Sequence, residues 1–486
     1  MKRQQGIAYQ LELFPLNGEN SNATRHLENC EAVSGANERK EFQVNEAGQQ
    51  ERALANCNLM QVICSTINIR RAYKRVKQNK GVAGIDQMPV EKFADWFKDE
   101  GENLIKSLQS GTYQPNAVKL VEIPKPNGGV RILGIPTVKD RIIQQAIAQV
   151  LSQIYDPLFS EHSYGFRENR NAHQALKKAS VYVEEGRNKV VDIDLKTFFD
   201  LVNHDRLMYE LSTKIGDKIL LKLIRKYLQT GMLKGGIVSQ RLEGTPQGSP
   251  LSPLLSNIVL DELDRELEKR GHKFVRYADD CNIFVRSQVA GERVMQSVSH
   301  FIENKLKLVV NKDKSKACDV NQTKFLGYTI QKGGGLSISK QNQERFKEKI
   351  RLITKRNRGR SFEQVLSELN PALRGWLQYF QHARCSKLML DLDSWIRRKL
   401  RCYRIKQCKR VFTLQQFLKR LGVKNWSSWM LALSGKGHWR KSRSPQVQHA
   451  MNNEWFVEQG LYNLAWHYER LKSLKKPPCA QACTVV

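Results

Sequence analysis

The sequence lacks paired cysteines. Its ten Cys residues are scattered over 486 positions, and no C-x-x-C pair occurs among them. The closest spacings, Cys402 to Cys408 and Cys479 to Cys483, do not fit the paired ligands of a zinc ribbon. We therefore expect reduced thiols in a cytoplasmic protein, and neither a disulfide framework nor a structural zinc site.

Long apolar runs are also missing. No segment approaches the roughly 18 consecutive apolar residues of a membrane-spanning helix. The first 30 residues lack a basic start followed by an apolar stretch, so no secretory signal is indicated. These absences predict a chain without a membrane-spanning segment. Its 486 residues are too many for one core, and roughly two to four domains are expected.

Acidic residues are absent between Ser394 and Asn453, where 15 Lys or Arg occur. The whole chain carries a net charge of +32, and residues 331–486, with 32 basic and 9 acidic side chains, hold +23 of it. Such an excess predicts a polyanionic partner, either nucleic acid or a membrane surface. Seven of the eight Trp lie after residue 375. Most are expected in the cores of small helical domains, and some could stack on exposed bases.

Helical and strand patterns alternate up to residue 330. An amphipathic pattern predicts one helix over Leu59–Gln78, and an apolar one predicts a helix over Val138–Ile154. Between them, Val118–Ile123 and Val130–Leu133 flank a Pro- and Gly-rich turn and predict a β-hairpin. This alternation favours an α+β region with an antiparallel sheet.

Strand patterns vanish past residue 340, which predicts an all-helical last third. A helix is expected over Gln343–Arg356, and Ser361 with Gln364 forms a capping-box signature. Asn370 and Pro371 are interpreted as the N-cap and first-turn proline of a further helix. Residues 1–57 and 473–486 are predicted to be disordered tails.

Two acidic sites interrupt otherwise apolar strands. Asp279 and Asp280 lie between the apolar pairs at 274–275 and 283–285, a pattern that predicts a hairpin with both carboxylates at its turn. Asp194 stands in a second apolar strand, 190–195. An unpaired carboxylate in such a place is costly because it loses its hydration. A bound Mg²⁺ ion, which carboxylates and substrate phosphates coordinate, would compensate this negative charge. The sequence therefore predicts a metal site.

Seven short motifs follow one another in order: Ile123-Pro124-Lys125-Pro126 with Arg131, Ser163–Arg167, Asp194–Asp200, Pro246-Gln247-Gly248, Tyr277–Asp280, Asn311–Ser315 and Phe325–Tyr328. This order resembles that of reverse transcriptases, and most closely that of the multifunctional proteins encoded by bacterial group II introns. Each motif alone is weak evidence for this family, whereas seven motifs in the right order are specific to it. The segment Ile338–Arg384 is similar to the thumb and maturase region of that family.

The resemblance implies two Mg²⁺ ions, with Mn²⁺ as an alternative, coordinated by Asp194 and Asp279. Asp280 would complete the acidic cluster, and Leu195 would lend its backbone carbonyl to one ion. The resemblance also assigns dNTP binding to Lys125, Arg131, Phe199, Gln247, Gly248 and Lys314, and a primer grip to Phe325, Leu326 and Gly327. Lys314 is in addition a candidate for protonating the pyrophosphate.

Several of these residues have alternative interpretations. Phe199, implied to exclude a 2′-hydroxyl, could be a core residue like its neighbour Phe198. Lys125 and Arg131 could be solvated hairpin charges. Asp192 shares a strand face with Asp194 but is interpreted as a structural salt bridge or hydrogen bond at the strand end.

The implied fold is a right-hand polymerase, with fingers and palm, followed by an all-helical thumb and maturase region. Expected boundaries are 58–112 for an N-terminal extension, 113–332 for fingers and palm, 333–400 for thumb and maturase, and 401–472 for a basic helical DNA-binding domain. The implied function is RNA-directed DNA synthesis plus assistance to intron splicing, with intron RNA, target DNA or primer, and dNTPs as partners.

Two other functions stay open at this point. The chain could be a domesticated reverse transcriptase in phage defence or repair, or a splicing cofactor with a vestigial polymerase. The paired Cys motifs and clustered His of an HNH nuclease are not found, which suggests the class of group II introns whose proteins lack this nuclease.

Overall fold

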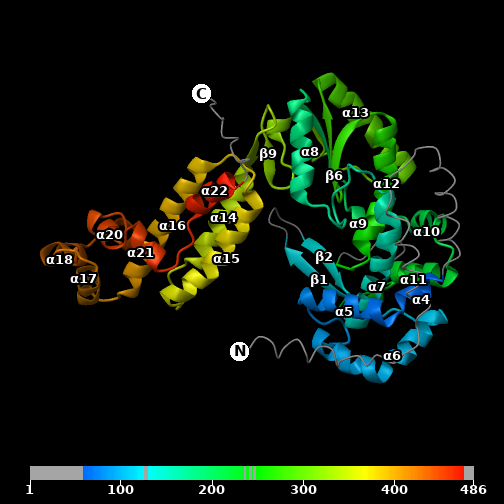
Figure 1. Cartoon of the computed structure of the whole chain (residues 1–486), viewed down its shortest axis with the longest axis horizontal. Coiled ribbons are helices and arrows are strands. Elements are labelled where there is room, and N and C mark those ends of the chain that lie inside the picture. Colours follow the sequence, from blue (N-terminus) through cyan, green and yellow to red (C-terminus); the bar gives the residue numbers. More distant parts are fainter. Residues whose placement is uncertain (1–57, 125–129, 235–236, 240–242, 245–247, 475–486) are drawn as a thin grey trace, which may run out of the picture. The chain divides into compact units, whose positions relative to one another are not determined.

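The structure is a computed structural model that describes residues 58–124, 130–234, 237–239, 243–244 and 248–474. The predicted tail at 1–57, and all but the first two residues of the tail at 473–486, lie outside these ranges. The chain divides into two compact units (Figure 1). Unit 1 comprises residues up to 179 together with 187–318, and unit 2 comprises 180–186 together with 319 onward. Across the described ranges, no helix is both long and apolar enough to cross a membrane.

Unit 1 begins with two helices where the sequence predicts one. Helix α4 spans Leu59–Ile63 and α5 spans Thr66–Gln78. The prediction is wrong because Ser65 caps α5 by accepting a hydrogen bond from the Asn68 N–H, while the Asn68 side chain donates to the Ile63 carbonyl at 3.0 Å. One Ser and one Asn thus stop one helix and start the next within two residues.

A first sheet follows, in the order β2-β1-β4-β5. Its antiparallel hairpin joins β1 (Val118–Pro124) to β2 (Val130–Ile135), as the sequence predicts. Strand β4 (Met232–Lys234) pairs in parallel with β1 and antiparallel with β5 (Ile237–Ser239).

Helix α7 (Val138–Tyr155) confirms the expected apolar helix and packs against α5 in the core of unit 1. The Thr137 hydroxyl caps it by accepting from the Asp140 N–H. The buried Asp140 carboxylate in turn accepts from the hydroxyls of Thr137, Tyr113 and Tyr227. These donors satisfy a charge that would otherwise be costly to bury.

The second sheet has the order β6-β7-β3-β8, with β6 (Lys273–Tyr277) and β3 (Lys189–Ile193) both antiparallel to β7 (Asp280–Val285). Strand β8 (Lys316–Asp319) forms the other edge. This is the predicted antiparallel palm sheet. Helices α12 (Ser252–Lys269) and α13 (Gln288–Phe301) pack on it (Figure 1). The remaining elements of unit 1 are η1 (Val90–Lys92), α6 (Phe93–Gln109), η2 (Asp156–Leu158), α8 (Ala172–Glu184, whose end belongs to unit 2), α9 (Phe198–Leu201), α10 (His204–Ser212), α11 (Lys218–Gln229) and the π-helical η3 (Ile302–Leu306).

Unit 2 opens with η4 (Val320–Gln322) and a short hairpin of β9 (Tyr328–Ile330) and β10 (Leu336–Ile338). The described residues beyond it are helical, as predicted. Its helices are α14 (Lys340–Ile353), α15 (Phe362–Phe380), α16 (Ser386–Gln407), α17 (Val411–Arg420), α18 (Asn425–Leu433), α19 (His438–Lys441), α20 (Pro445–Ala450), α21 (Asn453–Glu458) and α22 (Leu464–Ser473).

Helix α15 confirms one prediction and overturns another. The capping box of Ser361 and Gln364 is present at its start. Pro371, however, lies inside the helix and does not begin a new one. Asn370 is not a cap, because its side chain donates to the Gly460 carbonyl and accepts from the Tyr462 N–H. The helix therefore tolerates an internal proline, and the Asn serves tertiary packing.

Candidate active site

The tight turn between β6 and β7 carries the acidic pair. Tyr277 pairs with Asp280, which leaves Ala278 and Asp279 as the turn residues, so Asp280 is the first residue of β7. Ala278 has φ of +58°, a left-handed conformation that costs a residue with a side chain about 1–2 kcal/mol. Such strain is held in place only when the surroundings fix the backbone.

Asp194 lies one residue beyond β3, next to this turn. Ile193 is the register partner of Cys281, so the next residue along falls beside Asp280. Desolvation, followed by the negative charges of Asp279, Asp192 and Asp194, raises the pKa of Asp280 to about 7. The pairing of β3 with β7 therefore brings Asp194 close enough to the turn for its charge to act on Asp280. The assignment of these carboxylates to a metal site stays a prediction.

The charge of Asp192 also acts on Asp280, and that of Asp194 acts on Asp192. It pairs in register with Asn282, and desolvation raises its pKa to about 6 while Lys316 works to lower it and Asp194 to raise it. The sequence interpretation gave Asp192 a structural role at a strand end. Its two-residue spacing from Asp194 was the signal that both side chains share a sheet face.

A loop between η3 and β8 holds Asp194. The Asn311 side chain donates to Asp194 Oδ2 at 2.9 Å, and the Asn311 N–H donates to the Asp194 carbonyl at 2.8 Å. Ser315 Oγ accepts from the Asp194 N–H, and Lys314 Nζ lies 3.4 Å from Asp194 Oδ2. Of the residues in the motif Asn311–Ser315, the resemblance assigns a role only to Lys314. The structure shows that Asn311 orients the Asp194 carboxylate, while Ser315 holds the Asp194 backbone.

A fully buried ion pair lies beneath the turn. Arg276, the residue before Tyr277, contacts Asp264 of α12 through Nε at 2.8 Å and Nη2 at 2.5 Å, and neither side chain reaches solvent. Its Nη1 donates to Asn257 Oδ1 at 3.0 Å and to the Ala278 carbonyl at 2.9 Å. Desolvation works to lower the pKa of Arg276, but the facing carboxylate outweighs it and leaves that pKa raised. This guanidinium therefore ties the strained turn to α12.

The motif Ser163–Arg167 supports the same turn from the other side. The Tyr164 N–H donates to the Arg276 carbonyl, and the Arg276 N–H donates to the His162 carbonyl, both at 2.9 Å. A Cβ on Gly165 would come within 2.2 Å of the Ala278 nitrogen, so only glycine fits. The sequence alone assigns no role to this motif, whereas the structure shows that its backbone contacts the strands and turn that carry the acidic pair.

The predicted dNTP-binding residues are only partly described. Lys125, Gln247 and the Arg131 side chain lie outside the described residues, although the Arg131 backbone pairs with Ile123 in the hairpin. Phe199 is half-buried, whereas Phe198, 5.3 Å away between ring centroids, is a core residue.

Gly248 has φ of +107°, and a Cβ there would lie 3.0 Å from the Gly134 carbonyl oxygen. Leu195 is buried and forms an isolated bridge with Val310. The roles of Phe199, Gly248 and Leu195 stay predictions, since their geometry only makes them compatible with the assigned functions.

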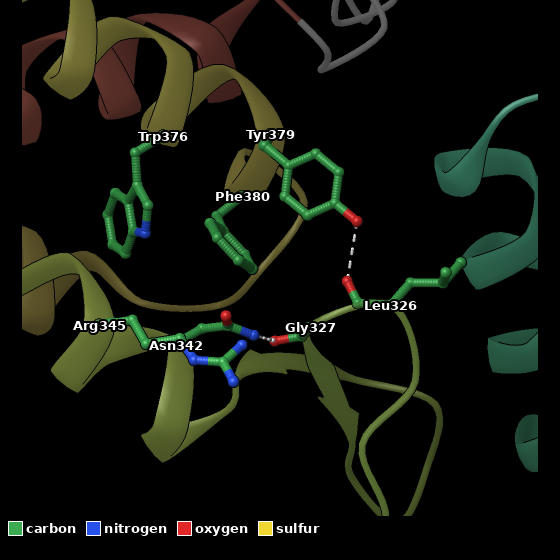
Figure 2. Close-up of a pocket in the computed structure, with 7 residues that line it drawn as sticks. All are labelled: Leu326, Gly327, Asn342, Arg345, Trp376, Tyr379 and Phe380. Atoms are coloured by element: carbon green, nitrogen blue, oxygen red, sulfur yellow. Dashed lines mark hydrogen bonds between the residues drawn. The ribbon is translucent and has the colours of Figure 1, made fainter. Parts of the chain in front are cut away.

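The predicted primer grip lies in unit 2 (Figure 2). Phe325 is buried, and Leu326 and Gly327 both have positive φ. The Tyr379 hydroxyl donates to the Leu326 carbonyl at 2.8 Å, and the Asn342 side chain donates to the Gly327 carbonyl at 3.0 Å. These bonds fix the loop at the edge of a cavity of about 460 Å³. Its lining comprises Leu326, Gly327, Asn342, Arg345, Trp376, Tyr379 and Phe380.

The donor set of the acidic cluster suits a hard divalent cation. Carboxylate oxygens are the ligands that Mg²⁺ and Mn²⁺ prefer. The charges of the neighbouring carboxylates add to desolvation in raising the pKa of Asp280, whereas Lys314 works to lower it. Within the described ranges no three His, Cys, Asp or Glu side chains already form a preassembled metal site. Asp194 instead faces Lys314 and Asn311. The residues therefore fit a divalent cation that takes some of its ligands from outside the protein better than one held in a closed protein cage.

Comparison with known proteins identifies the class. Residues 123–330 match the reverse transcriptase (RNA-dependent DNA polymerase) family, and residues 343–422 match the group II intron maturase-specific domain. The chain is 33% identical to protein YkfC of Escherichia coli K12 over 262 residues, which covers 46% of this chain and 69% of YkfC. The chain therefore belongs to the reverse transcriptases that carry a group II intron maturase domain.

A second relative is the group II intron-encoded protein LtrA of Lactococcus lactis, 32% identical over 329 residues. That match covers 53% of this chain and 54% of LtrA, so the chain spans about half the length of this curated relative. Among solved structures, a Cas6-RT-Cas1–Cas2 complex is 26% identical over 52% of this chain and 44% of that chain, with a TM-score of 0.34.

Proposed function

We propose that this chain is an RNA-directed DNA polymerase that copies group II intron RNA into cDNA and assists the splicing and mobility of that intron. The observation that carries the polymerase is that the pairing of β3 with β7 places Asp194 beside the strained turn that bears Asp279 and Asp280. The match over residues 343–422 supports the maturase activity. It favours this function over a role in defence or repair.

The proposed chemistry follows from the carboxylate cluster. Asp194 and Asp279 would hold two Mg²⁺ ions, with Asp280 completing the cluster and the Leu195 carbonyl as a further ligand. Bound Mg²⁺ would activate the primer hydroxyl and neutralise the triphosphate. Asn311 keeps the Asp194 carboxylate oriented and Ser315 holds the Asp194 backbone, so little reorganisation is needed when substrate arrives.

The substrate contacts are proposed from the same assignment. Lys125 and Arg131 would clamp the triphosphate by charge-assisted hydrogen bonds, and Lys314 would serve the pyrophosphate. Phe199 would exclude the 2′-hydroxyl, while Gln247 and Gly248 would contact the sugar and template. Proposed partners are intron RNA, a DNA primer or target, and dNTPs, with 401–472 as a DNA-binding domain.

Primer extension on an RNA template tests the polymerase. The wild-type chain with Mg²⁺ should incorporate dNTPs, and Asp279→Ala should lower the rate by at least about 1,000-fold because a metal ligand is lost. Asp313→Ala is the matched control, because it also removes a carboxylate. Asp313 is exposed and lies two residues from Asn311 in the sequence. Equal rates for wild type and Asp279→Ala would refute the assigned site.

A further inference from the structure

Two segments that carry predicted nucleotide contacts meet at Gly244. Helix α9 carries Phe199, and Gly244 lies three residues before Gln247 in the sequence. The Gly244 N–H donates to the Val202 carbonyl at 2.8 Å. A Cβ on Gly244 would lie 2.7 Å from the Phe199 carbonyl oxygen, and equally close to the Cα and carbonyl oxygen of Asp200. The Gly244 backbone therefore packs directly on the backbone that bears the Phe199 ring, which is called the sugar gate below.

A buried histidine holds the other polar group of Gly244. His204, the first residue of α10, is buried, and its Nε2 lies 2.7 Å from the Gly244 carbonyl oxygen. A carbonyl oxygen only accepts hydrogen bonds, so Nε2 carries a proton and donates it. Both backbone polar groups of Gly244 are thus bonded to the segment 202–204, 40 residues earlier in the chain. This segment fixes the place where the glycine packs on α9.

Helix α9 depends on support from its neighbours. It has only four residues, and a helix this short is not stable by itself. Thr197, the residue before it, has φ of +45°, which is a strained conformation for a β-branched side chain. Strained backbone persists only where the surroundings fix it. Phe198 anchors the helix in the core, and Gly244 packs on the backbone of residues 199 and 200. The placement of the sugar gate therefore depends on Gly244.

The far side of the Gln247 segment is fixed to the fingers. Gly248 packs on β2, and the Ser249 hydroxyl donates to the Gln144 side chain of α7. The residues that flank Gln247 in the sequence are therefore held at both ends, on α9 through Gly244 and on the fingers through Gly248 and Ser249. Because the finger end does not involve His204, loss of the histidine bond changes the α9 end alone.

We propose that His204 and Gly244 are positioning residues that set how strictly the polymerase excludes ribonucleotides. The proposal rests on the proposed function, because it concerns the sugar gate of that reaction. The His204 N–H holds the Gly244 carbonyl, Gly244 packs on α9, and α9 presents the Phe199 ring to the nucleotide sugar. A misplacement of about 1 Å in an active site can change a rate roughly 100-fold. Both residues act through Phe199, so their loss changes the choice of sugar more than the chemical step.

Single-nucleotide incorporation by the full-length chain tests this proposal. The substrate is a DNA primer annealed to an RNA template, and the selectivity is kcat/KM for dCTP divided by kcat/KM for CTP. His204→Leu leaves the buried Gly244 carbonyl without its donor and should lower the selectivity roughly 10- to 100-fold. The kcat for dCTP should change little, because the acidic cluster is intact. His204→Gln restores an N–H donor and should recover most of the selectivity. Gly244→Ala should lose at least as much as His204→Leu, because its Cβ displaces α9.

Two control variants separate the placement of the gate from general stability. The Asn203 side chain caps α10 by accepting from the Arg206 N–H at 3.0 Å. Asn203→Ala should therefore lower the melting temperature but keep the wild-type selectivity. Gly186 has φ of +88°, close to the +85° of Gly244, and a Cβ there meets no atom within 4 Å. Gly186→Ala imposes the same backbone strain without contact to α9, so its selectivity should equal that of the wild type.

Several results would overturn the proposal. These are an unchanged selectivity in His204→Leu, an equal loss in Asn203→Ala or Gly186→Ala, and no recovery in His204→Gln. A loss in His204→Leu together with unchanged selectivity in Phe199→Ala would also overturn it, because the histidine would then act through another residue. The wild-type rate distinguishes this failure from that of the proposed function. A wild-type chain that incorporates neither nucleotide would refute the polymerase itself, whereas an active wild type with any of the results above would refute only the placement of the gate.

Discussion

Replacing the buried arginine beneath the acidic turn should separate stability from activity. In Arg276→Met, the Asp264 carboxylate stays buried and loses its partner, which typically costs about 3–5 kcal/mol. Asn257 Oδ1 and the Ala278 carbonyl also lose their shared donor, at about 1–3 kcal/mol for a buried acceptor, although such losses are not additive. We expect a destabilisation of about 5 kcal/mol, a large part of a total stability of about 5–15 kcal/mol.

The double variant Arg276→Met/Asp264→Leu provides the decisive comparison. Replacing both charges by apolar groups removes the uncompensated carboxylate, so most of the lost stability should return. Activity should not return, because the Ala278 carbonyl still lacks its donor and the turn is no longer tied to α12. In this account Arg276 is a positioning residue, and its loss should raise the Mg²⁺ concentration needed for half-maximal rate.

The assay must report on unit 1. Seven of the eight Trp lie after residue 375, so intrinsic fluorescence would follow unit 2. Hydrogen exchange of peptides from β6 and β7 reports directly on the strands around the turn. The reasoning is refuted if the single variant loses less than about 1 kcal/mol, or if the double variant recovers the wild-type rate and Mg²⁺ dependence.

Three further predictions follow from the same site. Gly165→Ala should abolish primer extension, because its Cβ would displace the Ala278 nitrogen. In the control Gly435→Ala, the added Cβ meets no atom within 4 Å, so the extension rate should equal that of the wild type. Equal extension rates for the two variants would contradict this prediction. Folding raises the pKa of Asp280 from its ordinary 3.8 to about 7, so the metal-free chain binds the extra proton and should lose stability as pH rises from 4 to 7. Thermal melts should show that Mg²⁺ offsets the loss and that Asp280→Asn flattens the profile. Phe199→Ala should admit rNTPs in a misincorporation assay, and unchanged discrimination would make Phe199 a packing residue.

The local pattern of the chain determined most elements. Apolar alternation predicts the hairpins over 118–135 and 274–285 because one face of each strand must be buried. The helix over 138–155 follows from a periodicity of 3.6 residues. Motif order predicts which acidic residues form the site, and the structure places Asp194 beside the turn that bears Asp279 and Asp280.

Tertiary structure decided the features that depend on partners distant in sequence. In the sequence Arg276 looks like any other basic residue of a basic chain, and only the fold brings it to Asp264 and buries both. Asn370-Pro371 looks like a helix start, but the carbonyl of Gly460, 90 residues away, takes the Asn side chain. The register of β3 against β7, which places Asp194 beside the turn, is likewise set by pairing between segments about 90 residues apart. Sequence patterns specify which faces are buried, whereas polar contacts between distant segments are specified only once those faces meet.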